Sequence, residues 1–498
     1  VRALISDQGL DLKVAVVLGD DLIGQKDNLS PTEMFSGESF PDPARMASVN
    51  AYLGAFPIAQ ALDEGADIVI TGRSVDSAVT LGACIHEFGW SAKEWDKLSG
   101  GTLAGHLLEC GPQATGGNFT DWHLVVDNMD IVGYPIGEVS ADGSFDVVKV
   151  DGTGGTVSVG TVSEQMIYEI GDPQAYIVPD VVCDFSAVKI TQAAEDRVHV
   201  AGAKGYPATD SYKVSATYGD GWRGGTLMTF YGVDADKKAR GFAKNAFKRA
   251  STALRASNLG DFTETSVEIL GAASQFGEHR RISGAREVVL KFAAKHPEQA
   301  GIGILLKEAT GMGLATPPGL SGFSGARAKP SPVVRLFSFL IPKDDLSIQI
   351  DFGDRELTFA RSITETFADG MIQRPSDPAA PANDGEMVDV PLIDLAWGRS
   401  GDKGNKANVG IIARQADYLP YIWAALSEGV VSGRFSHFLE GETERFLMPG
   451  SNAINFLMDE ILGGGGVASL RSDAQGKGYA QILLDHPISI PKAMAENL

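Results

Sequence analysis

The stretch Ala66-Asp67-Ile68-Val69-Ile70-Thr71-Gly72-Arg73-Ser74-Val75-Asp76-Ser77 decides the fold class of this chain. Its apolar first half predicts a buried strand, and the apolar-periodic segment that continues to Phe88 predicts a helix. Open α/β sheets bind ligands in the loop between such a strand and the helix that follows it. Arg73 could therefore hold a carboxylate or phosphate, with Ser74 and Asp76 as further binding or helix-capping groups. The alternative for Arg73 is a salt bridge between elements.

The segments around this stretch alternate between strand and helix patterns. An apolar strand is predicted over Leu12–Leu18 and a helix over Ala55–Asp63, which indicates an α/β domain with a mixed or parallel sheet. Glycine-punctuated apolar runs make residues 127–210 a strand-rich middle region. Further helices are predicted over Ser163–Ile170, Lys237–Ala256 and Ser283–Ala294.

A run rich in Pro, Ala and Asp, Met371–Val388, predicts an interdomain linker. We therefore divide the chain into an α/β domain over 1–370, a linker over 371–388, and a small α+β domain of ferredoxin-like type over 389–498. The elements predicted for the last domain are strands at 390–397, 409–414, 444–448 and 479–485 and helices at 417–430 and 452–462.

The polar loop Ala396–Gly410 in the C-terminal domain has the composition of a binding loop for an anionic small molecule. Arg399 and Lys403 supply cationic donors, Asp402 is the nearest counter-charge in the sequence, and Asn405 adds an amide. No hydroxyl residue follows the lysine, so the loop is not a phosphate-binding P-loop. The alternative is a charged hairpin loop on the surface.

The predicted helix Gly101–Cys110 places His106, Glu109 and Cys110 on one face. His106 and Glu109 are candidates for acid/base catalysis. The surrounding leucines favour a packed helix with a hydrogen-bonded histidine over a metal site, for which a fourth ligand is missing. We therefore expect no metal ion and no other cofactor.

Two further polar segments could contribute to the site. In the first, Asn118 could bind substrate, and Asp121 and His123 could form an acid/base pair if the chain is extended there; a glycine-rich turn that satisfies its own backbone is the alternative. In the second, Lys204 lies among glycine and tyrosine residues and could polarise a carbonyl group, although solvated turn residues are the default.

Composition limits the partners. The chain has 498 residues and a formal net charge of -22, which argues against nucleic acid and anionic membranes as main partners. Three dispersed cysteines do not form a disulfide framework, so we expect a cytoplasmic protein. The first residues read as the middle of a helix, and we expect an N-terminal portion to precede them. We also expect a homo-oligomer.

Several long segments resemble one family. Ile70–Ala78, Gly101–Gly111, Ile170–Pro173 and Pro179–Phe185 are similar to the acyclic terpene utilisation A (AtuA) proteins, and Ala396–Gly404 resembles the ferredoxin-fold domain that often follows in the same chains. The family's usual strand-rich opening, with a glycine-containing turn, is absent before Val1. The resemblance implies a role in the breakdown of citronellol-type terpenoids or related branched acids, in pathways that run through acyl-CoA thioesters.

From these observations we expect a catabolic enzyme that acts on a branched-chain or terpenoid acyl-CoA, or a related carboxylate, by acid/base chemistry of hydratase or lyase type. The anion would be held by Arg73 and the loop from Arg399 to Lys406, and protons would be moved by His106, Glu109, Asp121 or His123. The alternative is a non-catalytic subunit or scaffold of a catabolic complex, in which the polar loops are interfaces.

Overall fold

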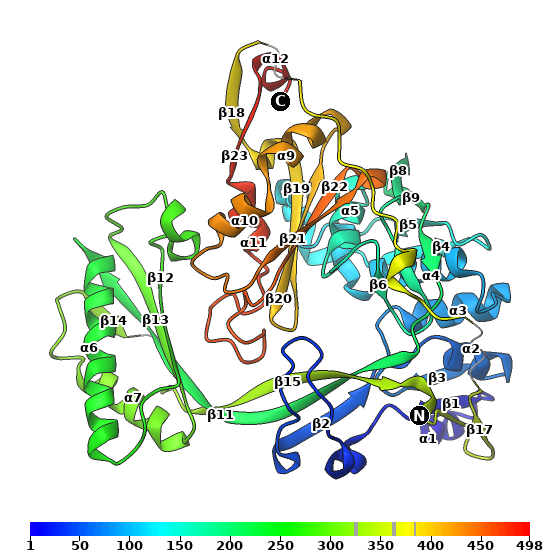
Figure 1. Ribbon diagram of the computed structural model, residues 1–498, viewed down its shortest axis with the longest axis horizontal. Coiled ribbons are helices and arrows are strands. Elements are labelled where there is room, and N and C mark those ends of the chain that lie inside the picture. The colour runs from blue at the N-terminus through cyan, green and yellow to red at the C-terminus, as the bar shows by residue number, and fades with distance from the viewer. Residues whose placement is uncertain (323–326, 361–364, 383–384) are drawn as a thin grey trace.

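The computed structural model describes residues 1–322, 327–360, 365–382 and 385–498, and it contains the predicted mixed α/β architecture (Figure 1). After the short helix α1 (Arg2–Asp7), strands β1 (Val14–Leu18) and β3 (Ile68–Thr71) pair in parallel. β16 (Gln349–Asp351) and β17 (Glu356–Thr358) extend this sheet in antiparallel order. The helices beside it are α2 (Phe56–Asp63) and α3 (Ala78–Phe88). The predicted strand, loop and helix around Arg73 are therefore confirmed.

The strand-rich middle region packs around one buried helix, α4 (Trp95–Glu109), whose residues from Leu98 to Leu107 are all buried. Around it lie α5 (Val159–Ile167) and two small antiparallel sheets. The first sheet has the strand order β4 (Pro135–Val139), β5 (Phe145–Lys149), β9 (Arg197–Ala201) and β8 (Lys189–Ala194). The second has the order β10 (Lys204–Tyr206), β7 (Val182–Asp184) and β6 (Tyr176–Ile177).

A long twisted ribbon of antiparallel strands connects the middle region to a separate lobe (Figure 1). β11 (Ser211–Tyr231) pairs over its first part with β15 (Ser331–Pro342) and β2 (Met46–Ala51), and its register shifts between Gly219 and Trp222. Beyond that shift β11 pairs with strands of the lobe, whose sheet packs against two helices. The lobe contains β12 (Glu264–Leu270), β13 (Glu287–His296), β14 (Leu320–Gly322), α6 (Ala235–Ala256) and α7 (Gln299–Gly311).

The C-terminal region is built on a four-stranded antiparallel sheet that packs against the middle region. Its order is β19 (Ala396–Lys403), β20 (Lys406–Ala413), β22 (Ala453–Met458) and β21 (Thr443–Met448). A second pair, β18 (Met387–Pro391) and β23 (Pro487–Pro491), lies beside it. The helices are α8 (Leu392–Leu395), α9 (Leu419–Ala425), α10 (Glu428–Arg434), α11 (Tyr479–Leu484) and α12 (Lys492–Ala495).

Close contact between α5 and this sheet joins the two parts of the chain. A Cβ atom at Gly410, in β20, would lie 2.4 Å from a side-chain carbon of Ile167, the last residue of α5. Only glycine allows the backbones to approach this closely. A buried helix of the middle region therefore lies directly against the C-terminal sheet, and the residues that follow α5 lie beside the β19–β20 hairpin.

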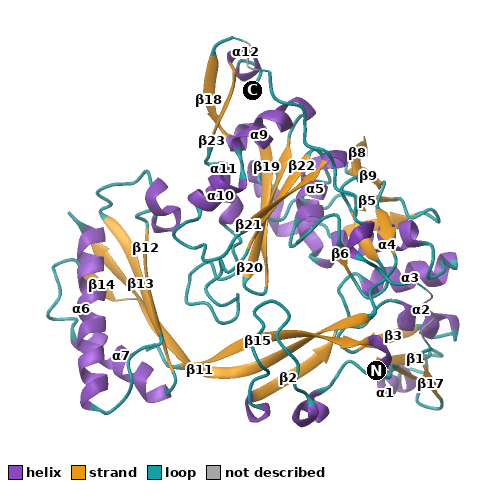
Figure 2. Cartoon of the chain, viewed as in Figure 1, coloured by secondary structure: helices purple, strands orange, loops and turns teal. Residues whose placement is uncertain are grey.

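Three predicted elements have the wrong secondary structure, as Figure 2 shows. The predicted helix 283–294 is mostly strand β13, because Val288, Leu290 and Phe292 alternate into the core under α6 and α7. The predicted helix 452–462 is strand β22, and the predicted strand 479–485 is helix α11. Both are short apolar segments that are largely buried, and such segments lack the periodicity that distinguishes helix from strand.

Other predictions have misplaced boundaries. The helix predicted from Ser163 begins at Val159, because Ser158 and Thr161 form a reciprocal capping box in which each side chain accepts a hydrogen bond from the other's backbone. The predicted helix 417–430 is split into α9 and α10, where Ser427 caps the second helix. The predicted strand 390–397 is divided among β18, α8 and β19. Of the predicted linker, residues 383–384 lie outside the described part.

Candidate functional site

Polar groups from seven segments meet where the middle region contacts the β19–β20 hairpin. These segments are the residue after β2, the β3–α3 loop, the C-terminal end of α4, the residues after α5, the start of β11, the hairpin itself, and the residues before α11. Their charged and polar side chains interact electrostatically with one another. We call them the charge cluster, and its members are Tyr52, Arg73, Asp76, His106, Glu109, Tyr168, Glu169, Lys213, Asp402, Lys403 and Lys477.

Glu169 lies at the centre of the charge cluster. Its carboxylate accepts hydrogen bonds from Nζ of Lys403 at 2.7 Å and from Nζ of Lys477 at 2.8 Å. Burial alone would raise the pKa of Glu169, but the two ammonium groups lower it to about 2. Lys477 also donates to Asp402 at 3.0 Å and to the hydroxyl of Tyr168. Glu169 therefore remains ionised and joins the middle region to the C-terminal region.

Two asparagines of the C-terminal sheet hold Glu169 in place. Glu169 has a positive φ of 56°, a conformation that costs a non-glycine residue on the order of 1 kcal/mol. Oδ1 of Asn408 accepts a hydrogen bond from the Glu169 backbone N–H, and its Nδ2 donates to the carbonyl of Ile167. Asn455 binds the carbonyl of Ile170 in the same way. The strained turn is thus stabilised by side chains almost 240 residues away in the sequence.

Lys403 is a member of the charge cluster that solvent can reach. Its side chain is 49% exposed, yet the surrounding protein desolvates the ammonium group. That burial would lower the pKa of Lys403, but Glu169 beside it raises the pKa, and Glu109 and Asp76 add to this effect. Lys403 is therefore a charged donor that a small ligand could reach.

The C-terminal end of α4 adds an acid and a histidine. Nδ1 of His106 lies 3.7 Å from Oε2 of Glu109, so the predicted shared face exists. His106 is 2% exposed, packs against the ring of Tyr176, and has no hydrogen-bond partner for either ring nitrogen among the described residues. Burial would raise the pKa of Glu109, but His106 and Lys403 lower it. Glu109 is thus an ionised carboxylate that can accept a proton.

Two cations of the charge cluster have no anionic partner among the described residues. The guanidinium of Arg73 lies 4.5 Å from the ring centroid of Tyr52, and Nζ of Lys213 lies 5.8 Å from the same ring. Both side chains are exposed. Although the Lys213 side chain is exposed as a whole, the surrounding protein desolvates its ammonium group and lowers its pKa, and the like charges of Lys403 and Arg73 lower it further. Neighbouring unpaired cations repel each other, so an anion bound between them would be stabilised.

Arg399 is buried and lies against Tyr168 of the charge cluster. Its Nη1 donates to the carbonyl of Asn118 at 2.7 Å, its guanidinium lies over the ring of Tyr168, and it is 3.7 Å from Glu164. Arg399 and Glu164 are both buried. This geometry favours a positioning role for Arg399 and Asn118 over direct contact with a ligand.

Several residues predicted for the site lie outside the charge cluster. Asp121 forms two hydrogen bonds of 2.7 and 2.6 Å with Arg414, and within the described chain it has none with the exposed His123. Lys204 forms a surface ion pair with Asp96 at 2.7 Å. The structure therefore gives Asp121 and Lys204 structural partners and does not bring them to the charge cluster.

The polar loop of the hairpin also has partners that differ from those expected in the sequence. The carboxylate nearest to Lys403 is Glu169 rather than Asp402. Oδ1 of Asn405 accepts hydrogen bonds from the backbone of Gly464 and Gly465, so this amide orders a glycine-rich loop. Ser74 forms an isolated backbone bridge with Leu53. The loop itself is largely the β19–β20 hairpin, which agrees with the alternative of a charged hairpin, whereas ligand binding by the loop stays a prediction.

Sequence reasoning missed five members of the charge cluster, which are Tyr52, Tyr168, Glu169, Lys213 and Lys477. Lys213 ends the polar segment that contains Lys204, and Lys477 lies between two glycines. The glycine neighbours of Lys477 are a weak signal that the backbone approaches other groups closely there. Nothing local marks Glu169, because its partners come from the distant C-terminal region.

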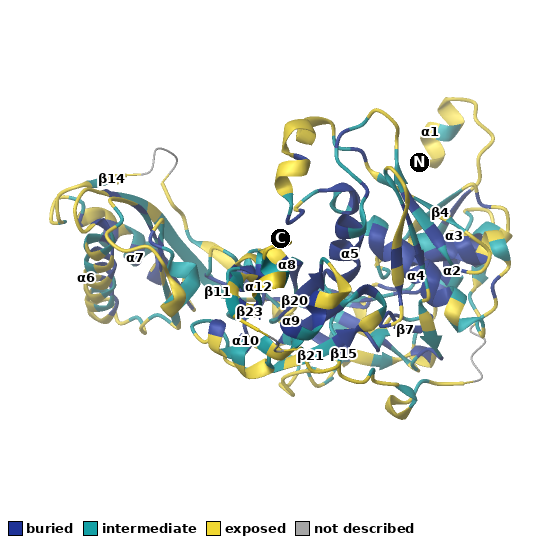
Figure 3. Ribbon diagram, turned by 90° about the horizontal axis from the view of Figure 1, so that it is seen from above, coloured by how far each residue is buried: buried dark blue, intermediate teal, exposed yellow. Residues whose placement is uncertain are grey.

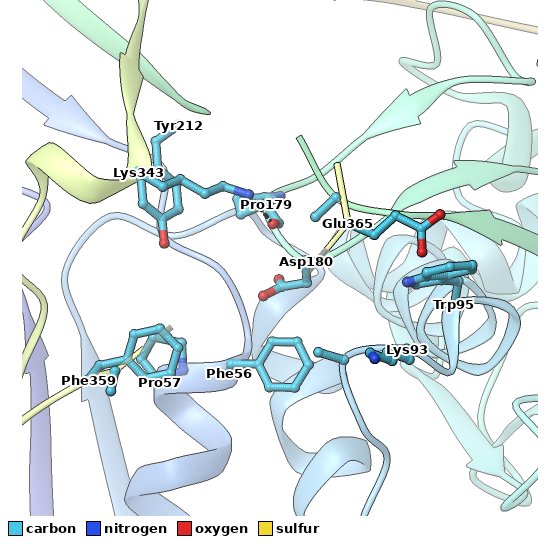
Figure 4. Close-up of a pocket in the computed structure, with 13 residues that line it drawn as sticks. Phe56, Pro57, Lys93, Trp95, Pro179, Asp180, Tyr212, Lys343, Phe359 and Glu365 are labelled. Carbon is cyan, nitrogen blue, oxygen red and sulfur yellow. Dashed lines mark hydrogen bonds between the residues drawn. The ribbon is translucent and has the colours of Figure 1, made fainter. Parts of the chain in front are cut away.

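A cavity of about 260 Å³ lies on the other side of β11 and is shown in Figure 4. Tyr212 lines it, whereas the neighbouring Lys213 belongs to the charge cluster, because successive side chains of a strand point to opposite faces. Asp180 accepts a hydrogen bond from the backbone N–H of Ala55 at the start of α2, and burial raises its pKa. Lys343 donates to the carbonyl of Pro179. The cavity is therefore separate from the charge cluster.

Two other kinds of feature, a metal-binding cluster and a membrane-spanning helix, are absent from the described residues. Histidine, cysteine, aspartate and glutamate side chains form no group of three or more there that could hold a metal ion. Within the same residues, no helix has the length and apolar character needed to cross a membrane.

The fold and the site together define a two-part α/β protein with a charge cluster where a small C-terminal α+β domain meets the N-terminal region. A model of the acyclic terpene utilisation family protein AtuA matches residues 1–352, and a model of the AtuA ferredoxin-like domain matches residues 390–489. The chain therefore belongs to the AtuA family. Searches of curated proteins and of solved structures found no match.

Proposed function

We propose that this chain is a catabolic enzyme that binds a branched-chain or terpenoid acyl-CoA, or a related carboxylate, and acts on it by acid/base chemistry of hydratase or lyase type. Membership of a family named for acyclic terpene utilisation supports the substrate class. The observation that carries the proposal is a pair of cations without an anionic partner among the described residues, Arg73 and Lys213, in the same charge cluster as the ionised carboxylate of Glu109.

In this proposal the cations bind and polarise the substrate. Arg73 and Lys213 attract the negative charge of a carboxylate or phosphate in a chain whose net charge is otherwise -22. Lys403 donates a hydrogen bond to a substrate carbonyl and stabilises the negative charge that develops on its oxygen when a neighbouring carbon loses a proton. Glu169 keeps Lys403 protonated and oriented.

Proton transfer is assigned to Glu109. This carboxylate is ionised, lies near Lys403, and can remove a proton from the carbon next to the polarised carbonyl. The imidazole of His106, whose Nδ1 lies 3.7 Å from Oε2 of Glu109, lies beside this carboxylate and lowers its pKa. Asp76 also interacts electrostatically with Lys403 and is a second carboxylate for a leaving hydroxyl group or an attacking water. The set combines a cationic binding surface, a carbonyl-polarising group and a base.

Thermal unfolding with ligands tests the proposal. Midpoints would be measured for the wild type, Arg73→Met and Lys213→Met with free CoA, branched acyl-CoA thioesters and the corresponding free acids. A ligand that binds only the folded state raises the midpoint, so the wild type should be stabilised and both variants much less. Lys189→Met, which removes an exposed cation of β8, is the matched control and should respond like the wild type.

Turnover separates an enzyme from a binding subunit. Ligands that stabilise the wild type would be assayed for hydration, dehydration and carbon-carbon cleavage, with Glu109→Gln as the variant that retains binding and loses turnover. Stabilisation that is equal in wild type and Arg73→Met would refute the binding site. Binding without turnover, together with co-purification of a second polypeptide, would support the non-catalytic subunit instead.

A further inference from the structure

The segment from residue 122 to residue 136 exposes an unusual number of large apolar side chains. Seven of them are between 39% and 69% exposed, although single exposed apolar residues are normal on protein surfaces. A contiguous group of this kind marks an interaction surface. We call it the apolar segment, and its exposed members are Trp122, Leu124, Val126, Met129, Ile131, Tyr134 and Ile136.

The backbone of the apolar segment is held in place by hydrogen bonds, whereas its apolar side chains are exposed to solvent. The N–H of Gly154 donates to the carbonyl of Ile131 at 2.8 Å, and the N–H of Gly133 donates to the carbonyl of Gly154 at 3.0 Å. A Cβ atom at Gly154 would lie 2.2 Å from the carbonyl oxygen of Asn128, so the two backbones touch. The side chains are thus presented on an ordered support, as a docking surface requires.

The charge of the apolar segment indicates the chemistry of its partner. Asp127 and Asp130 lie between the apolar side chains, and both are exposed without an ion pair in the described residues. The segment contains no lysine or arginine. A complementary surface would combine apolar contacts with positive charge.

Helix α6 of the lobe presents such a positive surface. It contains seven basic residues and one acidic residue, whereas the whole chain has a net charge of -22. Arg240, Lys244 and Lys248 are exposed, and within the described residues they form no ion pair. Their spacing of four residues places them on one face of the helix. We call them the basic stripe, and Val233, 75% exposed, lies just before the helix.

The two surfaces lie at opposite ends of the molecule. β4, which contains Ile136, and α6 are at opposite ends of the long axis in Figure 1, and Figure 3 shows the same separation from above. They cannot meet within one copy of the chain, so an interaction between them requires a second copy. In a two-fold dimer both contacts would form at once.

We propose that this chain forms a homodimer in which the apolar segment of each copy docks on the basic stripe of the other. This inference does not depend on the proposed catalytic activity. In such a dimer the apolar side chains would be buried and the surface charges paired. This combination is typical of protein interfaces, in which an apolar centre is surrounded by a polar rim.

Analytical ultracentrifugation of charge-swap variants tests the proposal. The wild type should sediment as a dimer, whereas Lys244→Glu/Lys248→Glu and Asp127→Lys/Asp130→Lys should each sediment as monomers. The quadruple variant carries both reversals and should recover the dimer, because the charges are again opposite. A merely structural effect of either pair would not be rescued in this way. Lys26→Glu/Lys189→Glu, which changes two lysines elsewhere, is the control for net charge and should remain a dimer.

Other outcomes would overturn the proposal. A monomeric wild type at tens of micromolar, or a dimer that both reversals leave intact, would show that these surfaces do not pair. Flotation with phosphatidylserine vesicles would be measured in parallel. Binding of a monomeric wild type that is lost on Met129→Ser/Ile131→Ser would assign the apolar segment to a membrane surface instead. Circular dichroism of every variant would confirm folding.

Discussion

Two glutamates, one inside helix α5 and one just after it, have pKa values that are shifted in opposite directions. Glu164, inside α5, is buried with Arg399 at 3.7 Å, and burial raises its pKa to about 7. Glu169, just after α5, accepts hydrogen bonds from two lysines, and its pKa is lowered to about 2. Two cations at hydrogen-bond distance overcome the cost of burial at Glu169, whereas a single cation at 3.7 Å does not at the more deeply buried Glu164.

The largest expected effect comes from removing the charge of Glu169. Glu169→Gln leaves Lys403 and Lys477 without their main counter-charge in a partly buried site, and we expect a loss on the order of 3 kcal/mol in the free energy of unfolding at pH 7. Urea titration would measure it. Glu386→Gln, which breaks the exposed pair with Lys492, should change the stability by less than about 0.5 kcal/mol.

The pH dependence of stability checks the same ion pair. The pKa of Glu169 is lowered on folding from 4.5 to about 2, so its contribution is fully present above about pH 4.5 and is lost as the pH falls towards 2. The difference between the wild type and Glu169→Gln should therefore shrink over this range. A difference that stays constant down to the lowest pH at which both proteins are folded would contradict the ionised pair.

A smaller effect is expected from the support of Glu169. Asn408→Ala removes hydrogen bonds to the backbone at Ile167 and Glu169, and unpaired buried groups should cost about 2 kcal/mol of stability. The strained φ of Glu169 would then relax, so ligand-induced stabilisation should fall as well. Asn497→Ala, at the exposed C-terminal end, is the control. Loss of stability with unchanged ligand binding would show that Asn408 only supports the fold.

The smallest effect, and of opposite sign, is expected at Glu164. Its pKa is raised on folding from 4.5 to about 7, so the carboxyl group destabilises the fold progressively as the pH rises from 4.5 to 7. Glu164→Gln should remove this slope and stabilise the protein by about 1 kcal/mol at pH 8, less than the full shift because Arg399 loses a partner. Clear destabilisation at pH 8 would mean that the pair with Arg399 outweighs burial.

These comparisons show why the site was only partly predictable from the sequence. The strand, loop and helix around Arg73 and the shared face of His106 and Glu109 follow from local periodicity, and both are present. The partners of Lys403, Asn405 and Asp121 do not, because each lies far away in the sequence. The nearest charge in the sequence was a poor guide to the nearest charge in space.

The sequence by itself determined the alternation of strands and helices, the C-terminal α+β domain and the acidic balance of the chain, because periodicity and composition act locally or sum over all residues. The tertiary structure decided that the buried segments β13 and β22 are strands, and that Glu169, Lys213 and Lys477 belong to one charge cluster. The physical reason is that buried runs have no local periodicity, and charges act through space rather than along the chain.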